Sequence, residues 1–206
     1  NAVLDRGIWV KGQSTGEVQP VTITGEPVDD WAANLVNEAI AKDLFPAHLK
    51  GQDLREPITR TQFAALSVRL YEAMSGQTVP VFTGTNPFTD TTDPEVLKAY
   101  SMGFTSGVSS TSFGAGTQLN REQAATMLSA VYRKLGGTIP PQEAAPFSDR
   151  GSISAWARDS VCFAASKGVF SGYEDGRFGP KDPAQRQACL IMALRMQQKL
   201  GSSAAI

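Results

Sequence analysis

The strongest pattern in the chain is helical, because apolar residues recur every three to four positions in several separate stretches. Two stretches carry them at i, i+3 and i+7: Phe63, Leu66 and Leu70, then Ala124, Met127 and Val131. Two more carry small or aromatic residues at i, i+4 and i+8: Trp31, Leu35 and Ala39, then Trp156, Ser160 and Ala164. Each stretch predicts a helix with one buried stripe, so we expect a mainly α fold.

The helical stretches recur in a fixed order, which indicates an internal repeat. Each unit has an aromatic or acidic opening, an Ala-rich stretch, a turn, and a second stretch that begins at an arginine. These arginines, Arg60, Arg121 and Arg186, lie 61 and 65 residues apart. Gly103 and Gly168 both precede the next of these arginines by 18 residues. The spacing predicts three units of two helices each.

The chain divides accordingly into a lead-in, three repeats, two linkers and a tail. The boundaries are 1–27 (lead-in), 28–76 (repeat 1), 77–87 (linker), 88–137 (repeat 2), 138–146 (linker), 147–201 (repeat 3) and 202–206 (tail). The stretches that contain these linkers, Gly76–Asn86 and Gly136–Pro146, are rich in Gly, Pro and Thr, which is typical of loops. The lead-in contains two short extended patterns, 8–10 and 21–23, and is either the end of a preceding domain or an edge hairpin.

Good capping residues mark the start of two of the second helices. Thr59 and Asn120 stand immediately before their arginines, and their side-chain oxygens can accept the free N–H groups of a first helical turn. Gln185 is a poor cap, so Asp182–Pro183 is an alternative start in repeat 3.

Several of these motifs resemble the S-layer homology repeat. In repeat 3 they are Phe147–Asp149, Trp156–Ala157, Gly168–Tyr173, Asp175–Pro180 and Arg186, and the other repeats contribute Pro57–Leu66 and Leu119–Ala124. The resemblance implies a pseudo-threefold helical unit. It also implies a non-catalytic anchoring module of a secreted Gram-positive surface protein, associated with the cell wall or S-layer. Its partner would be secondary cell-wall polysaccharide, often pyruvylated, held in grooves between repeats.

The motif is incomplete in places, which keeps an alternative function open. Its glutamate is replaced by Gln62, Gln123 and Ala188, Thr91 stands in place of Trp, and Val108 stands in place of Tyr173. The grooves should therefore differ, and those with residues of repeats 1 and 3 are best equipped. The alternative is a structural or protein-interaction scaffold of a larger secreted protein, with glycan binding lost.

The three arginines are the candidate cations for an acidic sugar. A guanidinium can hold a carboxylate by two parallel hydrogen bonds, and a first helical turn adds the positive end of the helix dipole. Because the same dipole disfavours a cation there, the recurrence of Arg60, Arg121 and Arg186 favours ligand binding over inter-repeat salt bridges.

Aromatic and small polar residues complete the candidate site. Trp31, Trp156 and Tyr173 either stack on a sugar ring or pack in the interior, and the Ser171–Gly172 turn allows close approach of a ligand. The aspartates of the repeat openings either accept sugar hydroxyls or cap the first helices, and these are Asp30, Asp90 and Asp149.

Composition argues against several other classes of function. A net charge of -1 gives no general attraction for nucleic acid or an anionic membrane, and we expect no membrane insertion. His48, the single histidine, is assigned to a loop, and no catalytic, cofactor or metal motif is recognisable, so we predict no enzyme activity. Cys162 and Cys189 are either buried thiols or a disulfide. The start at Asn1, without a leader, suggests a trimmed or processed chain.

Overall fold

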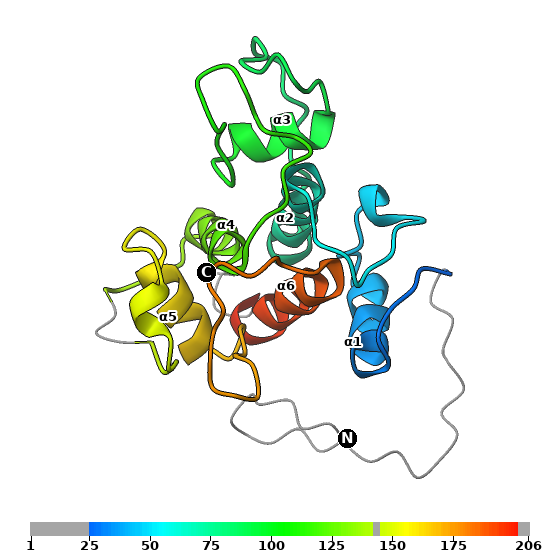
Figure 1. Ribbon diagram of the computed structural model, residues 1–206. Helices are drawn as coiled ribbons and strands as arrows, with labels where there is room; N and C mark the ends of the chain where they lie inside the picture. The colour runs from blue at the N-terminus through cyan, green and yellow to red at the C-terminus, as the bar shows by residue number, and fades with distance from the viewer. Residues whose placement is uncertain (1–24, 142–144, 202–206) are drawn as a thin grey trace.

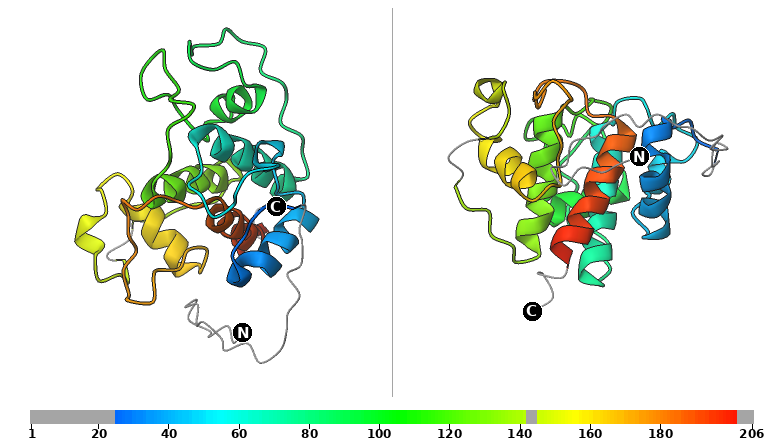
Figure 2. Two further views of the ribbon diagram at one scale, coloured as in Figure 1. Left: turned by 45° about the vertical axis from the view of Figure 1, so that its right-hand side comes forward. Right: turned by 90° about the horizontal axis from the view of Figure 1, so that it is seen from below.

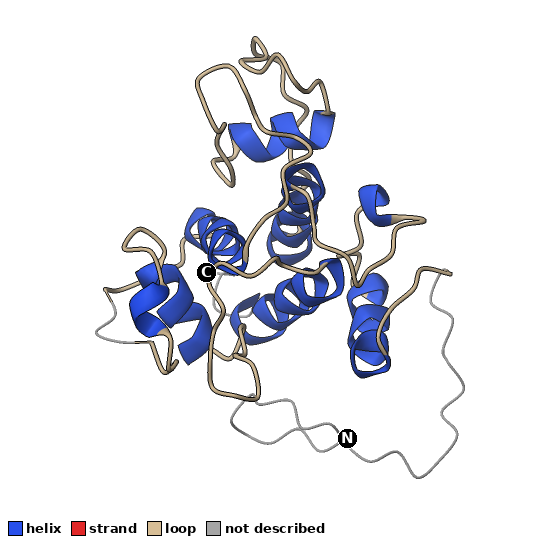
Figure 3. Ribbon diagram, viewed as in Figure 1, coloured by secondary structure: helices blue, strands red, loops and turns tan. Residues whose placement is uncertain are grey.

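The computed structural model describes residues 25–141 and 145–201, so the tail and nearly all of the lead-in lie outside it. It contains the α-helices α1 (Asp30–Ala41), α2 (Arg60–Ser75), α3 (Pro94–Ser101), α4 (Arg121–Lys134), α5 (Arg158–Ser166) and α6 (Arg186–Leu200). Two 3-10 turns are η1 (Ala47–Leu49) and η2 (Arg150–Ser152). The described ranges contain no strand (Figure 3). The predicted mainly α fold is confirmed.

The three long second helices form the centre, and the three first helices surround them (Figure 1). Central helix α2 packs against α4 and α6. Each outer helix packs on the second helix of the preceding repeat: α3 on α2, α5 on α4, and α1 on α6 (Figure 2). The main helix pairs therefore form between repeats, and the contact of α1 with α6 closes the three repeats into a ring.

A cycle of backbone hydrogen bonds closes the same ring just before the central helices. The Ile58 amide donates to Ala184 O (2.8 Å), the Ala184 amide to Leu119 O (2.9 Å), and the Leu119 amide to Ile58 O (3.0 Å). Each repeat thus donates once and accepts once. This cycle gives the chain an approximate threefold arrangement that a single chain completes by itself.

The central helices begin at the predicted arginines. Thr59 and Asn120 form capping boxes with Gln62 and Gln123, so glutamine completes the motif in place of glutamate. Gln185 makes no side-chain cap, but α6 still begins at Arg186. The alternative start at Asp182–Pro183 is wrong, because the Arg186 amide is instead satisfied by a carbonyl of repeat 1, Glu56 O, at 3.0 Å.

The predicted stripe of each of the first two central helices is buried as expected, and these residues are Phe63, Leu66 and Leu70 of α2 with Ala124, Met127 and Val131 of α4. In α1 the predicted Ala39 is buried, but Ala32 and Val36 are buried in place of Trp31 and Leu35. Helix α5 begins at Arg158, beyond Trp156. The predicted stripes through Trp31 and Trp156 are therefore wrong at these indoles, which are 43% and 58% exposed.

The two cysteines are buried and unlinked, so the disulfide alternative is wrong. Burial raises the pKa of both thiols. They belong to the packed interior of α5 and α6, as small apolar groups do. None of the helices within 25–141 and 145–201 is both long and apolar enough to cross a membrane.

Candidate functional site at the junctions between repeats

The candidate residues gather at three equivalent junctions, each joining the start of a central helix to the turn of the following repeat. The first junction joins α2 to residues 106–117, the second joins α4 to residues 171–182, and the third joins α6 to residues 53–56. The backbone register is the same in all three: Arg60 N to Thr117 O (2.9 Å), Arg121 N to Asp182 O (3.0 Å), and Arg186 N to Glu56 O (3.0 Å). Side chains at matching positions can therefore be compared directly.

At the second junction the guanidinium of Arg121 links repeats 2 and 3. Its Nε donates to Phe178 O (2.7 Å) and its Nη2 to Ser171 O (2.9 Å). Its carbon lies 4.8 Å from the centre of the Tyr173 ring and 5.0 Å from that of Phe178. Burial lowers the pKa of Arg121, which nevertheless remains a cation. The structure thus brings together three predicted site residues, Arg121, Ser171 and Tyr173.

Asp149 and Gly172 shape the turn that receives Arg121. The Asp149 carboxylate accepts the amides of Phe178 and Gly179, both at 2.8 Å, so it holds this turn. Asp149 stands at the N-cap position of η2, but its side chain makes no capping bond there. A side chain at Gly172 would place Cβ 2.6 Å from Arg177 O and 2.9 Å from the Phe147 ring. Glycine is therefore required by packing at this position.

A buried carboxylate beside Arg121 was missed by the sequence analysis. Glu122 is 1% exposed, and its Oε2 accepts the Ser154 amide at 2.9 Å. Its Oε1 accepts the Ser154 hydroxyl at 3.0 Å and forms an ion pair with Lys181. Lys181 Nζ also lies 2.6 Å from Ser154 Oγ. The cluster fixes Lys181 against Ser154, and the exposed Trp156 follows two residues later in the chain.

The first junction repeats the arginine contacts but lacks this cluster. Arg60 donates from Nε to Phe113 O (2.9 Å) and from Nη2 to Ser106 O (2.5 Å), and its carbon lies 4.9 Å from the Phe113 ring centre. Burial lowers the pKa of Arg60. The exposed Val108 replaces the aromatic ring of Tyr173, as the sequence indicates, and Gly116 occupies the position of Lys181.

A carboxylate holds the turn of the first junction as well. Asp90 accepts the amides of Phe113 and Gly114, each at 2.7 Å, and the hydroxyl of Ser112 at 3.0 Å. These bonds, above all that from the Phe113 amide, lower the pKa of Asp90 to about 2. The expectation that Asp90 caps the first helix is wrong, because Asp93 is the N-cap of α3.

The third junction uses an amide in place of the buried carboxylate. Gln187 is fully buried; its Nε2 donates to Asp29 Oδ2 (2.6 Å) and its Oε1 accepts the Asp29 amide (3.0 Å). Trp31 follows two residues later and donates from Nε1 to the same carboxylate at 3.2 Å. Asp30 lies between them, exposed in the first turn of α1. Asp29, rather than the predicted Asp30, is thus the aspartate that is fixed.

The arginine of the third junction also bonds across the repeats. Arg186 donates from Nη1 to Asp53 O (2.7 Å) and from Nε to Gln62 Oε1 (3.0 Å). Within the part of the chain that the structure describes, none of the three junction arginines forms an ion pair. The salt-bridge alternative is therefore wrong, because the acceptors are backbone carbonyls and one amide oxygen.

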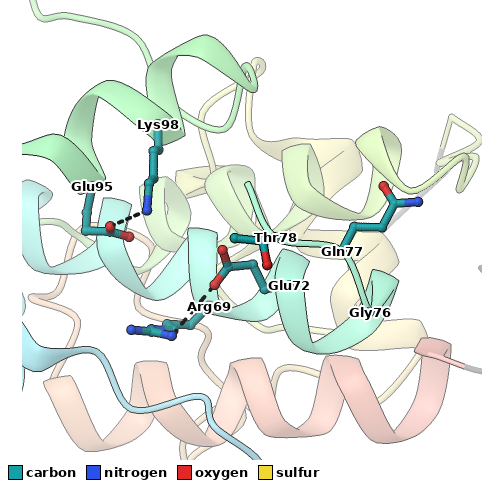
Figure 4. Close-up of a pocket in the computed structure, with 7 residues that line it drawn as sticks. All are labelled: Arg69, Glu72, Gly76, Gln77, Thr78, Glu95 and Lys98. Atoms are coloured by element: carbon teal, nitrogen blue, oxygen red, sulfur yellow. Dashed lines mark hydrogen bonds and ion pairs between the residues drawn. The ribbon is translucent and has the colours of Figure 1, made fainter. Parts of the chain in front are cut away.

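Two other polar features lie away from the junctions. A pocket between α2 and α3 contains the ion pairs Arg69–Glu72 (3.7 Å) and Lys98–Glu95 (2.8 Å), so its charges are matched within the protein (Figure 4). His48 lies in η1 rather than in a loop, and its Nε2 is 2.7 Å from Asp93 Oδ2. Among the described residues, no group of three His, Cys, Asp or Glu side chains could hold a metal ion.

The second junction lies in the part of the chain that can be assigned by comparison. Two segments match the S-layer homology domain. They are residues 87–125 and 146–188, and each runs from the opening of a repeat into its central helix. The S-layer homology domain is generally a cell-wall anchoring module, so these segments indicate association with the cell surface. Repeat 1 joins them through the ring of backbone hydrogen bonds.

The curated relatives are much longer proteins. The chain is 29% identical over 136 residues to an endoglucanase of Bacillus sp. (strain KSM-635), which covers 64% of the chain and 14% of that protein. It is 26% identical over 182 residues to an amylopullulanase of Thermoanaerobacterium thermosulfurigenes, and this match covers 84% of the chain and 9% of that protein. It is 25% identical over 200 residues to exoglucanase XynX of Acetivibrio thermocellus, and this match covers 93% of the chain and 18% of that protein. The chain spans less than a fifth of each relative.

Proposed function

We propose that this chain is a non-catalytic anchoring module that binds secondary cell-wall polysaccharide at the junctions between its repeats. The observation that carries the proposal is the second junction. There the Arg121 guanidinium lies over the ring of the exposed Tyr173, and the exposed indole of Trp156 belongs to the same matched S-layer homology segment as Tyr173. The proposed ligand is an acidic sugar of the pyruvylated type. The proposed location is the wall or S-layer of the cell, as part of a longer secreted protein.

The chemistry of the second junction suits such a ligand. An acidic sugar needs a cation for its carboxylate and a flat apolar surface for its ring. Trp156 is 58% exposed and Tyr173 is 39% exposed, so both rings are accessible. Arg177 lies 5.2 Å from the Tyr173 ring centre and is itself paired with Asp175 at 2.7 Å. The region is therefore rich in fixed charges and exposed rings at the same time.

The test is calorimetric titration of the protein with purified wall polysaccharide, before and after chemical removal of its pyruvate groups. We expect saturable binding that weakens strongly without pyruvate. A thermal shift on ligand addition is the second readout, because a ligand that binds only the native state raises stability by mass action. Absence of both binding and a thermal shift with either preparation would contradict the anchoring function.

A second candidate, a scaffold that has lost glycan binding, is favoured by one observation. All three junction arginines use Nε and one Nη to bond other parts of the protein, at distances of 2.5 to 3.0 Å. A scaffold would give no response to the polysaccharide. It would instead change the stability of a neighbouring domain of the same protein, which differential scanning calorimetry of the longer chain can detect.

A further inference from the structure

We propose that Lys181, and not Arg121, is the cation that contacts the acidic group of the glycan, with the sugar ring on Trp156. This inference rests on the proposed function and assigns its specificity to one junction. It follows from three observations: the solvent exposure of Lys181 against the partial burial of Arg121, the groups that hold each cation, and the residues at the matching positions of the other junctions.

The ammonium of Lys181 keeps a donor for a ligand. A lysine ammonium has three N–H donors. One is directed to Glu122 and one to Ser154 Oγ, which leaves a third. The Lys181 side chain is 56% exposed, whereas Glu122 is 1% exposed. The buried carboxylate therefore fixes the lysine from below while the lysine itself faces solvent.

Arg121 is committed to the protein by comparison. Two of its nitrogens donate to the carbonyls of Phe178 and Ser171, and the aromatic rings of Tyr173 and Phe178 lie within about 5 Å of its guanidinium carbon. Its guanidinium is partly buried where repeats 2 and 3 meet, whereas Lys181 faces solvent. Arg121 is thus a positioning residue for the turn that carries Tyr173.

Lys181 contacts the chain segment that carries Trp156. The Ser154 hydroxyl contacts Lys181 Nζ. Trp156 is two residues further along the chain than Ser154, so the Cα atoms of Ser154 and Trp156 are at most about 7 Å apart. The indole is more than half exposed. A hexose with an acidic substituent can therefore place its ring on Trp156 and its carboxylate near Lys181.

The other junctions lack this arrangement. At the position of Lys181 the first junction has Gly116, which carries no side chain. The third junction has Arg55, whose Nε and Nη2 both bond the carboxylate of Asp53, at 2.9 and 2.6 Å. This pairing lowers the pKa of Asp53 to about 2. The exposed Arg55 is thus paired with a partly exposed carboxylate, whereas Lys181 is held by a buried carboxylate and a serine hydroxyl. The arrangement of the second junction is not repeated at the other two, so we expect one acidic-glycan site per chain.

The experiment titrates a short pyruvylated oligosaccharide, released from the wall polysaccharide, and its depyruvylated form into four proteins. These are the wild type, Lys181→Gln, Lys181→Arg and the control Lys50→Gln, which removes an exposed charge from repeat 1. We expect Lys181→Gln to weaken binding of the pyruvylated form about tenfold and to leave binding of the depyruvylated form unchanged. Lys181→Arg should retain the preference for pyruvate, and Lys50→Gln should match the wild type, with one site per chain.

The readout is the ratio of the two affinities, measured well below the melting temperature of each protein, so a change in stability does not imitate the expected result. A Lys181→Gln protein that keeps the full preference for pyruvate would overturn the assignment while the anchoring function stands. A wild type that binds both oligosaccharides equally would also overturn it. A wild type that binds neither would refute the proposed function, and the role of Lys181 with it.

Discussion

The first and second junctions share a backbone but differ in their polar side chains. Both have a central-helix arginine bonded to carbonyls of the next repeat, and both have an aspartate that holds the receiving turn. Only the second also has the Glu122–Lys181–Ser154 cluster, where the first has Thr61 and Gly116 at matching helix and turn positions. The first junction therefore joins its two repeats without the cluster.

The largest expected difference in stability between the two junctions comes from the buried carboxylate of Glu122. Glu122→Ala should destabilise the protein by about 3 kcal/mol, because it leaves the Ser154 amide and Lys181 without their acceptor. Thr61→Ala, at the matching position of the first junction, removes one hydroxyl bond to Ala115 O and should destabilise by less than about 1 kcal/mol. Urea denaturation followed by circular dichroism measures both. Equal losses would show that the two junctions are energetically alike.

Replacing the arginines of these two junctions should give a smaller difference in stability. Arg60→Met and Arg121→Met each remove two bonds to carbonyls, and each should destabilise the protein by about 2 kcal/mol. Arg121 has two aromatic rings beside its guanidinium and Arg60 has one, so Arg121→Met should be the worse by about 0.5 to 1 kcal/mol. The same denaturation curves test this order, and a reversed order would contradict it.

An exposed indole should matter for binding and hardly at all for folding. Trp156→Ala should change stability by no more than about 0.5 kcal/mol, because the ring is largely in solvent. It should weaken binding of the wall oligosaccharide about tenfold, which corresponds to about 1.4 kcal/mol. Trp31→Ala at the third junction is the matched variant and should leave binding nearly unchanged. Calorimetric titration distinguishes the two, and equal losses would place glycan at both junctions.

The smallest effect should come from the turn aspartate of the first junction. Because the pKa of Asp90 is lowered to about 2 from 3.8, its carboxylate contributes stability that is complete above about pH 4. That contribution is lost as the pH falls towards 2. Asp90→Asn should therefore lower the melting temperature slightly at pH 7, and the difference from the wild type should disappear near pH 2. A difference that stays constant over this range would show that the charge of Asp90 does not stabilise the turn.

Local features were predictable from the sequence because their causes are local. Apolar spacing and the caps Thr59 and Asn120 placed the central helices and their first residues. Exposure of the tryptophans was not predictable, since α1 buries Ala32 and Val36 rather than Trp31 and Leu35, and α5 begins after Trp156. A periodic pattern does not by itself fix where a helix starts.

The contacts between repeats could not be predicted from the spacing of apolar residues. Each outer helix packs on the central helix of the preceding repeat, and periodicity does not specify that partner. The acceptors of Arg60 and Arg121 are backbone carbonyls, which any residue supplies, so the side-chain sequence gives no signal for them. Glu122 and Lys181 are 59 residues apart and meet only after the ring has closed.

The contact of α1 with α6 has a mechanical consequence for the proposed anchoring function. Tension along an open row of repeats would detach the end unit first, because that unit has a single neighbour. In a closed ring every unit has two, so detaching any one of them requires two interfaces to rupture together. A pulling force applied at the start of α1 and the end of α6 is shared by two routes through the ring. One route is the third junction, and the other runs through the first and second junctions one after the other. The module is thus suited to resist steady pulling.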